Sequence, residues 1–242
     1  MSSLIATIEG IGFWADGLPS WRAARDFAVG GTLPDDAPSK PSPQLLAPNE
    51  RRRAPESVAI ALEVALAACA DAGRDPRTLP SVFASTHGDL GITDYMCDTL
   101  AHDPRAISPT KFHNSVHNAA AGYWTIGNGC VQATTAISAF DASFAQGLLE
   151  ALLQLSDGAE AVILAAYDTA SAGPLARVSR SEGLLGGALV LSRAAHGTRL
   201  RATLVDGAAP ATQGALARRG AANAMAPMLP LFDALASGDD VV

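Results

Sequence analysis

Cysteines, long apolar runs and basic residues are all scarce in this 242-residue sequence. The three cysteines, Cys69, Cys97 and Cys130, are too few and too scattered for a disulfide scaffold or a cysteine-rich zinc site, so a reducing cytoplasm is the expected compartment. A transmembrane helix needs about 18 consecutive apolar residues, and no such stretch occurs. No signal peptide is expected either, because no basic region precedes the first apolar residues.

The charge balance argues against a nucleic-acid-binding protein. The sequence has 17 Lys and Arg against 24 Asp and Glu, which gives a net charge of -7, whereas binding to phosphates depends on basic residues. A hydrophobic content of 48% with 17% charged residues is enough to build the core of a domain. Small-molecule or protein partners are expected instead.

Common catalytic and cofactor signatures are missing as well. There is no G-x-S-x-G, H-E-x-x-H or P-loop, and Gly10-Ile11-Gly12 lacks the third glycine of a dinucleotide fingerprint. His113 and His117 have a spacing that suits two metal ligands, but no third ligand is near, so a structural role is favoured. Cys130 precedes a strand and not a helix, which favours a structural role over a reactive thiolate. No cofactor or metal is predicted.

Apolar periodicity predicts alternating strands and helices, the pattern of an α/β sandwich. The last two strands are expected to form a hairpin, which indicates a mixed sheet. Residues 30–49 contain five prolines and are predicted to be a loop. The predicted strands are Leu4–Gly12, Ser81–Ser85, Gln132–Ala139, Ala161–Ala166, Leu184–Leu191 and Leu200–Asp206. The predicted helices are Leu18–Phe27, Pro55–Ala72, Ile92–Leu100, Asn114–Ile126 and Asp141–Leu155.

The turn Ser138-Ala139-Phe140-Asp141 joins a strand to a helix that is apolar around most of its circumference. Such a helix is normally buried between layers. Ser138 or Asp141 is expected to cap it, because both side chains can accept hydrogen bonds from free backbone N–H groups. Asp141 as a catalytic carboxylate is the alternative, although a helix N-terminus favours its ionised form.

Three segments resemble the N-terminal half of the β-ketoacyl synthases, within the thiolase-like fold. The helix that leads to the family's active-site strand is similar to Ser108-Pro109, Asn118, Ala121-Gly122 and Thr125-Ile126 here. The strand after the family's nucleophile helix is similar to residues 158–166. The family's D-G-F-V-x-G-E-G-A-x-x-L-V-L block is similar to residues 180–191. The resemblance implies half of the ketoacyl-synthase fold, with a mixed five-stranded sheet and helices on both faces. It covers residues 1–206, whose end is similar to the first strand of the family's second half, and leaves 207–242 as an extension of uncertain fold.

The family's nucleophile is missing from this sequence. In the family, the turn carries a cysteine that holds the acyl chain as a thioester. Counting forward from Ser108-Pro109 places that position on Asp141, and counting back from Asp168 places it on Phe140. The two catalytic histidines of the family lie in its second half, and His196 lies too early to match either one. The resemblance therefore implies no catalytic residue and a degenerate nucleophile position at Phe140 or Asp141.

These losses imply a non-catalytic subunit of the chain-length-factor type, without activity alone, in polyene or fatty-acid-type biosynthesis. The length is similar to that of the short ketoacyl-synthase-like subunit of aryl polyene clusters. The expected partner is a full-length β-ketoacyl synthase, paired through Gln132–Ala139 and the helix from Asn114, with Phe140 blocking an acyl chain. The interface and tunnel residues expected are Asn114, His117, Tyr123, Trp124, Thr134, Ile137 and Phe140.

A second partner is expected at Arg51-Arg52-Arg53. In the family, basic residues at this place help to dock the acidic acyl carrier protein, and they correspond to Arg52 and Arg53. Two alternatives to the subunit hypothesis stay open. One is a thiolase-like acyltransferase or hydrolase that uses Asp141, Ser138 or Cys130. The other is a carrier-protein-binding scaffold without a tunnel function.

Overall fold

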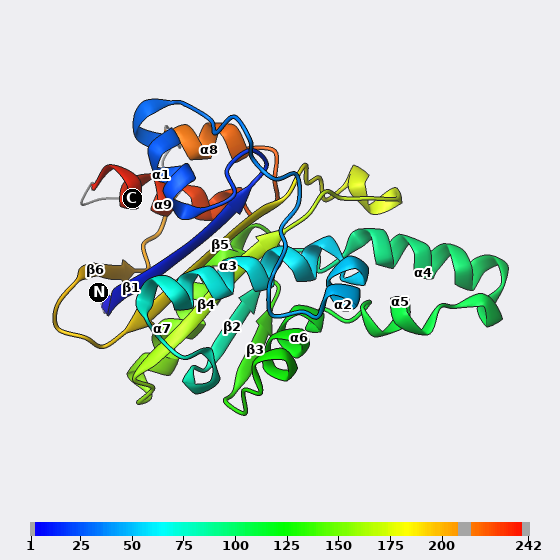
Figure 1. Cartoon of the computed structure of the whole chain (residues 1–242), viewed down its shortest axis with the longest axis horizontal. Helices are drawn as coiled ribbons and strands as arrows, with labels where there is room; N and C mark the ends of the chain where they lie inside the picture. The colour runs from blue at the N-terminus through cyan, green and yellow to red at the C-terminus, as the bar shows by residue number, and fades with distance from the viewer. Residues whose placement is uncertain (1–2, 208–213, 239–242) are drawn as a thin grey trace.

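A central β-sheet separates two groups of helices in this computed structural model, which describes residues 3–207 and 214–238 (Figure 1). The α/β sandwich predicted from the periodicity is thus confirmed. The sheet has six strands in the order β3-β2-β4-β5-β1-β6. Their bounds are β1 Ser3–Ala15, β2 Ser81–Ala84, β3 Thr134–Ile137, β4 Ala161–Asp168, β5 Leu185–Ser192 and β6 Thr198–Thr203.

The sheet is mixed, as predicted, but its make-up differs from the prediction in two ways. Strands β3, β2 and β4 are parallel, and β5, β1 and β6 each run antiparallel to the strand before them in the sheet. The predicted number of five strands is wrong because β6 adds to the free edge of the long strand β1. The predicted late hairpin is also wrong, since β1 lies between β5 and β6.

Helices cover both faces of the sheet (Figure 1). One face is covered by α3 (Glu56–Ala72) and α6 (Ala119–Asn128). The other face is covered by α1 (Trp21–Gly30), α7 (Ser143–Ser156), α8 (Ala215–Gly220) and α9 (Leu229–Ser237). The remaining helices, α2 (Pro48–Arg53), α4 (Leu90–His102) and α5 (Pro109–His113), lie to the side, where α4 and α5 project beyond the sheet.

Strand β4 shows how the sequence pattern produces the two cores. All eight of its residues are buried, as expected for a continuous apolar strand covered on both faces. Because side chains alternate along a strand, Val162 and Leu164 pack in the core that contains α7, whereas Ile163 and Ala165 pack in the core that contains α3.

Gly10 and Gly12 bring α3 into direct contact with β1. A Cβ atom added to Gly12 would lie 1.9 Å from the carbonyl oxygen of Val64, and one added to Gly10 would lie 2.3 Å from that of Ala68. The two glycines are thus explained by the close packing of α3 on β1, and no dinucleotide site is needed to account for them.

Two predicted helices begin three or more residues later than expected. The helix predicted to begin at Leu18 begins at Trp21, because Ser20 Oγ accepts a hydrogen bond from Ala23 N at 3.2 Å and caps it. The helix predicted from Asn114 begins at Ala119. Ser108 instead caps the separate helix α5, and the chain turns between the two helices. His113 and His117 therefore do not share one helix face.

The C-terminal helices belong to the same core as the first strand. The ring of Phe232 in α9 lies 5.4 Å from that of Phe13 in β1 and 5.8 Å from that of Trp21 in α1. Part of the predicted extension, residues 208–213 and 239–242, lies outside the described residues. The division of the chain near residue 206 stays a prediction.

Candidate functional site

The turn after β3 contains a strained residue. Phe140 has a φ of 54°, and it is the only non-glycine residue with a positive φ in the described part of the chain. A sharp, strained turn between a strand and a helix is the backbone arrangement of a nucleophile elbow. The Phe140 side chain is 58% exposed. Asp141 is the next residue, in a short 3-10 turn, and is also exposed.

Ser143, and neither Ser138 nor Asp141, provides the polar contacts of this turn. Its buried Oγ accepts a hydrogen bond from Ala139 N at 3.0 Å and donates one to Phe140 O at 2.7 Å. Ser138 Oγ donates instead to the carbonyl of Thr86 at 3.0 Å. The predicted helix cap at Ser138 or Asp141 is therefore wrong, because the N-cap residue of α7 is Ala142 and no side chain caps the helix.

The carboxyl ends of β2 and β4 meet beside the turn, at the buried carboxylate of Asp168. Its Oδ1 accepts hydrogen bonds from Ser85 Oγ at 2.7 Å and from Thr86 N at 3.1 Å. Burial raises the pKa of Asp168, because loss of solvent disfavours the charged form. Thr86 Oγ1 lies 3.5 Å from Phe140 O and so connects this network to the turn.

Strand β3 forms one edge of the sheet. Its partner β2 donates hydrogen bonds from Ser81 N to Ala133 O and from Ser85 N to Ile137 O. Because backbone groups alternate in direction along a strand, the N–H and C=O groups of Thr134 and Ala136 point outward. This edge is the part of the sheet that could pair with a strand of another chain.

Apolar side chains gather near this edge. A cleft of about 380 Å³ lies between the end of β3 and α7 and is lined in part by Ile137, Leu149 and Leu153. The inner face of α7 is buried, but within the described residues no second layer covers its outer face, which leaves Leu149 41% and Leu153 47% exposed. Other large apolar residues exposed between 112 and 153 are Phe112, Val116, Ile126, Val131 and Phe140.

The predicted interface residues fall into three environments. Thr134, Ile137 and Phe140 lie along β3 and the turn. Asn114 and His117 lie between α5 and α6, where His117 Nε2 is 2.9 Å from Ser85 O. The ring of Tyr123, which is half-buried, contacts that of His113 at 5.8 Å.

Trp124 is in the core and is no candidate for contact with a partner. Its side chain is fully buried, and its ring lies 6.1 Å from that of Phe83. Trp124 and Tyr123 are neighbours on α6 and point in different directions, so only Tyr123 can reach the surface. The prediction that either aromatic residue could close a partner's tunnel is therefore wrong for Trp124.

The predicted docking arginines lie in the short helix α2. Arg52 bonds the side chain of Asn49 on the same helix. Arg53 borders a cleft of about 430 Å³ together with Lys111 and Asn114. Arg52 and Arg53 are both exposed, as docking of an acidic protein would require.

Among the described residues, none of the three nucleophiles considered from the sequence has a hydrogen bond to a basic side chain. Cys130 is buried, and its Sγ contacts the carbonyl of Leu79 at 3.7 Å. Ser138 donates to a carbonyl, and Asp141 has no hydrogen bond from its side chain. Within the described residues, no group of three or more His, Cys, Asp or Glu side chains is arranged to hold a metal ion.

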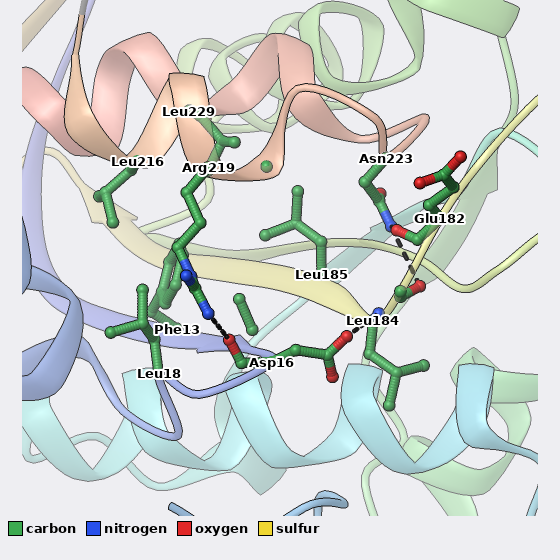
Figure 2. Close-up of a pocket in the computed structure, with 13 residues that line it drawn as sticks. Phe13, Asp16, Leu18, Glu182, Leu184, Leu185, Leu216, Arg219, Asn223 and Leu229 are labelled. Atoms are coloured by element: carbon green, nitrogen blue, oxygen red, sulfur yellow. Dashed lines mark hydrogen bonds between the residues drawn. The ribbon is translucent and has the colours of Figure 1, made fainter. Parts of the chain in front are cut away.

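A further cleft, of about 260 Å³, lies where α8 meets the end of β1 (Figure 2). Arg219 donates to the backbone oxygen of Asp16 at 2.7 Å, and the Asp16 carboxylate accepts from Leu184 N at 3.3 Å. The polar groups of this cleft thus form hydrogen bonds with protein groups, and apolar side chains line its base. Sequence analysis missed this cleft because Asp16 and Arg219 are 203 residues apart, so no local motif marks them.

Comparison with known proteins gives the family. The sequence model of the β-ketoacyl synthase N-terminal domain matches residues 21–241. The chain belongs to this family. The match extends beyond residue 206, where the resemblance found in the sequence ended. No curated protein matches this β-ketoacyl synthase domain in sequence.

Solved structures share the fold of this β-ketoacyl synthase domain. One is a chain of the ketosynthase ApeO in complex with its chain length factor ApeC from Xenorhabdus doucetiae, with 24% identity, a TM-score of 0.66, and coverage of 79% of this chain and 80% of that chain. Another is the ishigamide ketosynthase/chain length factor, with 16% identity, a TM-score of 0.66, and coverage of 79% and 62%.

A third similar structure is AntDE:AntF, a type II polyketide synthase acyl-carrier protein in complex with its ketosynthase bound to the hexaketide. Its identity is 15%, its TM-score 0.63, and the coverage 79% of this chain and 64% of that chain. The chain thus spans less than two thirds of the second and third structures. In residues 3–207 and 214–238, no helix has the length and apolarity needed to cross a membrane.

Proposed function

We propose that this chain is a non-catalytic, chain-length-factor-type subunit that pairs with a full-length β-ketoacyl synthase. The observation that carries the proposal is Phe140 at the strained position of the turn after β3. A condensing enzyme needs a thiolate at that position, and a phenyl ring can neither accept an acyl group nor leave room for one. Condensation then takes place in the partner alone.

The proposed interface is the β3 edge with the apolar surface beside it. Backbone groups of Thr134 and Ala136 are directed outward, and Leu149 and Leu153 expose apolar area next to them. An unpaired edge beside an apolar patch is normally covered by a partner. A similar fold occurs in complexes of a ketosynthase with a chain length factor, which supports a synthase as that partner.

The proposed effect on the product is to set its length. The turn between α5 and α6, with the buried Asn114 and the half-buried His117, and the half-buried residue Tyr123 would contribute to the closed end of the partner's tunnel. The resemblance to the short subunit of aryl polyene clusters supports a polyene product. The exposed Arg52 and Arg53 support an acyl carrier protein as the second partner.

The pairing is tested by co-expression with a full-length synthase from the same genome, followed by size-exclusion chromatography and native mass spectrometry. Wild type should co-purify in equal amounts with the synthase. Ala136→Pro should weaken the pair about tenfold or more, equivalent to about 1.4 kcal/mol, because it removes an outward N–H that β2 does not use.

Ala136→Ser is the matched control, since it keeps that N–H group. Retained pairing of Ala136→Ser with loss in Ala136→Pro supports the proposed edge. A wild-type chain that remains a soluble monomer beside the synthase contradicts the proposed function.

A further inference from the structure

A carboxylate, an imidazole and a hydroxyl group meet where β2 and β4 end. Asp168 is the last residue of β4, His87 follows β2, and Ser179 belongs to the loop between β4 and β5. His87 and Ser179 are 92 residues apart in the sequence, yet His87 Nε2 lies 2.5 Å from Ser179 Oγ. The other ring nitrogen, Nδ1, lies 3.9 Å from Asp168 Oδ1.

The imidazole is held in place between its two neighbours. The His87 side chain is only 8% exposed and that of Asp168 is fully buried. The backbone N–H of His87 also donates to Asp168 Oδ1, at 3.3 Å. The ring therefore keeps one nitrogen toward the carboxylate and the other toward the hydroxyl. At 3.9 Å, Nδ1 lies beyond hydrogen-bond distance from the carboxylate; catalytic hydrogen bonds are often long without substrate and shorten in the reacting complex.

Hydrogen bonds between Ser171 and Ser181 close the loop that carries Ser179. Ser171 N donates to Ser181 O at 2.8 Å, and Ser181 N donates to Ser171 Oγ at 3.0 Å. Ser181 Oγ in turn accepts from Ala224 N at 3.0 Å, which fastens the loop to the segment between α8 and α9. Ser179 is two residues from Ser181 and is half-buried, so its position is defined and part of the residue faces solvent.

We propose that Ser179, His87 and Asp168 form an acyl-transfer site, with Ser179 as nucleophile, His87 as general base and Asp168 as the group that orients the imidazole. A serine activated by a neighbouring base attacks acyl carbonyl groups. Leu175 and Val178, 48% and 76% exposed, lie in the same loop and offer apolar contact to an acyl chain. The substrate class is an acyl ester or thioester.

The reaction balances with water as the second substrate. Ser179 Oγ attacks the carbonyl carbon as His87 Nε2 takes the hydroxyl proton. The carbon–sulfur or carbon–oxygen bond of the leaving group breaks, and His87 returns the proton to the thiol or alcohol. Water then attacks the serine ester while His87 takes its proton, the ester bond breaks, and Ser179 regains that proton. The products are a carboxylic acid and a thiol or alcohol.

This site is separate from the proposed pairing at β3 and does not rest on it. It forms no carbon–carbon bond, so it is compatible with a chain that lacks the family's cysteine and that is non-catalytic in condensation alone. A rival role of the same contact is to fasten the loop without chemistry. Failure of the acyl-transfer site would leave co-purification with a synthase unaffected, so the two proposals fail independently.

The first test measures hydrolysis of p-nitrophenyl acetate and of acetyl-N-acetylcysteamine by the purified full chain. Release of p-nitrophenolate or of thiol by wild type should fall at least ~100-fold in Ser179→Ala and in His87→Asn, the size expected for loss of a nucleophile or a base. Ser156→Ala changes an exposed serine on α7 and should match wild type. A folded wild-type chain that hydrolyses neither substrate, or a Ser179→Ala variant as active as wild type, overturns the proposal.

The second test uses Ser179→Cys and remains informative if Ser179→Ala unfolds. A thiol beside the imidazole should be alkylated by iodoacetamide about tenfold faster at neutral pH than the exposed Cys97, because a neighbouring His⁺ lowers a thiol pKa. Adding His87→Asn should reduce that rate to the rate of Cys97. An introduced thiol that reacts no faster than Cys97 contradicts the role of His87 as a base.

Discussion

Glu9 is a single residue whose ionisation contributes to the stability of the first strand. It lies at the irregular step of β1, and Arg74 binds its two carboxylate oxygens at 2.7 and 2.9 Å. The Glu9 side chain is only 17% exposed. The hydrogen bonds from Arg74 hold the pKa of Glu9 below its usual value. A carboxyl group with a lowered pKa stabilises the fold only while it is ionised.

We predict that Glu9→Gln lowers the free energy of unfolding by about 1–3 kcal/mol at neutral pH, as expected for loss of hydrogen bonds to a charged group. The difference from wild type should be full above the usual glutamate pKa of about 4.3. It should shrink as the pH falls through the lowered pKa of the folded state. Urea unfolding at several pH values measures this.

Glu160→Gln is the matched control for Glu9. Glu160 accepts from the same Arg74 at 2.9 Å, but its side chain is 81% exposed. Exposed ion pairs contribute about 0–1 kcal/mol, so this variant should unfold almost like wild type at every pH. A loss for Glu160→Gln as large as that for Glu9→Gln would contradict the argument from burial.

The contact between α3 and β1 determines stability at the scale of elements. Gly10 and Gly12 let the helix backbone touch the strand, and any side chain there meets the carbonyl groups of Ala68 or Val64. We predict that Gly12→Ala destabilises the chain by about 1–3 kcal/mol, the usual effect of overpacking. Thermal and urea unfolding give the measurement.

Gly30→Ala is the control for this prediction. Gly30 ends α1, and nothing lies within 4 Å of a Cβ atom placed there. The change should be nearly neutral. If Gly12→Ala were as stable as Gly30→Ala, then α3 would have to move away from β1 at little cost, and the close packing would not matter for the fold.

The apolar periodicity of the sequence predicted single helices and strands better than it predicted which strands pair. The apolar run of β4 and the helix α3 were predicted to within two residues of their bounds. In contrast, the residues that pair with β1 lie at least 170 residues away in the sequence, so the position of β6 and the number of strands could not be read from a local pattern. The start of α6 was missed because Ser108 begins a separate short helix.

In the candidate site, too, the features marked by a local motif were predicted, and the contacts between distant parts of the sequence were missed. The resemblance led to the turn at Phe140 because sequence motifs flank it. It did not lead to Ser179 and His87, whose 2.5 Å contact joins two loops 92 residues apart. The lining of the cleft beside α7 was anticipated in part, through the predicted edge that contains Ile137, Ser138 and Ala139. Trp124 was misassigned because a helix pattern does not tell which of two adjacent aromatic residues faces the core.

The docking proposal depends on a contrast in charge across the molecule: Arg52 and Arg53 in α2 are basic, whereas the chain as a whole is acidic. We predict that Arg52→Glu with Arg53→Glu weakens binding of the acyl carrier protein, because the partner is acidic and the chain itself is acidic elsewhere. Raising the salt concentration should reduce the difference from wild type, since surface charges are screened. Fluorescence anisotropy with a labelled carrier protein gives both values.

Arg199→Glu with Arg201→Glu changes charge by the same amount on the exposed strand β6. It should leave carrier-protein binding close to that of wild type. Equal losses in the two double variants would mean that net charge, and not the position of Arg52 and Arg53, controls the association.

The position of β1 has a consequence for synthesis on the ribosome. This strand is made early, but both of its sheet neighbours, β5 and β6, are made after residue 184. At about 5–20 residues per second, β1 waits on the order of 10–30 s for them. During that time the nascent chain holds an unpaired apolar strand, so the rate of translation and the supply of chaperones govern how much of the protein escapes aggregation.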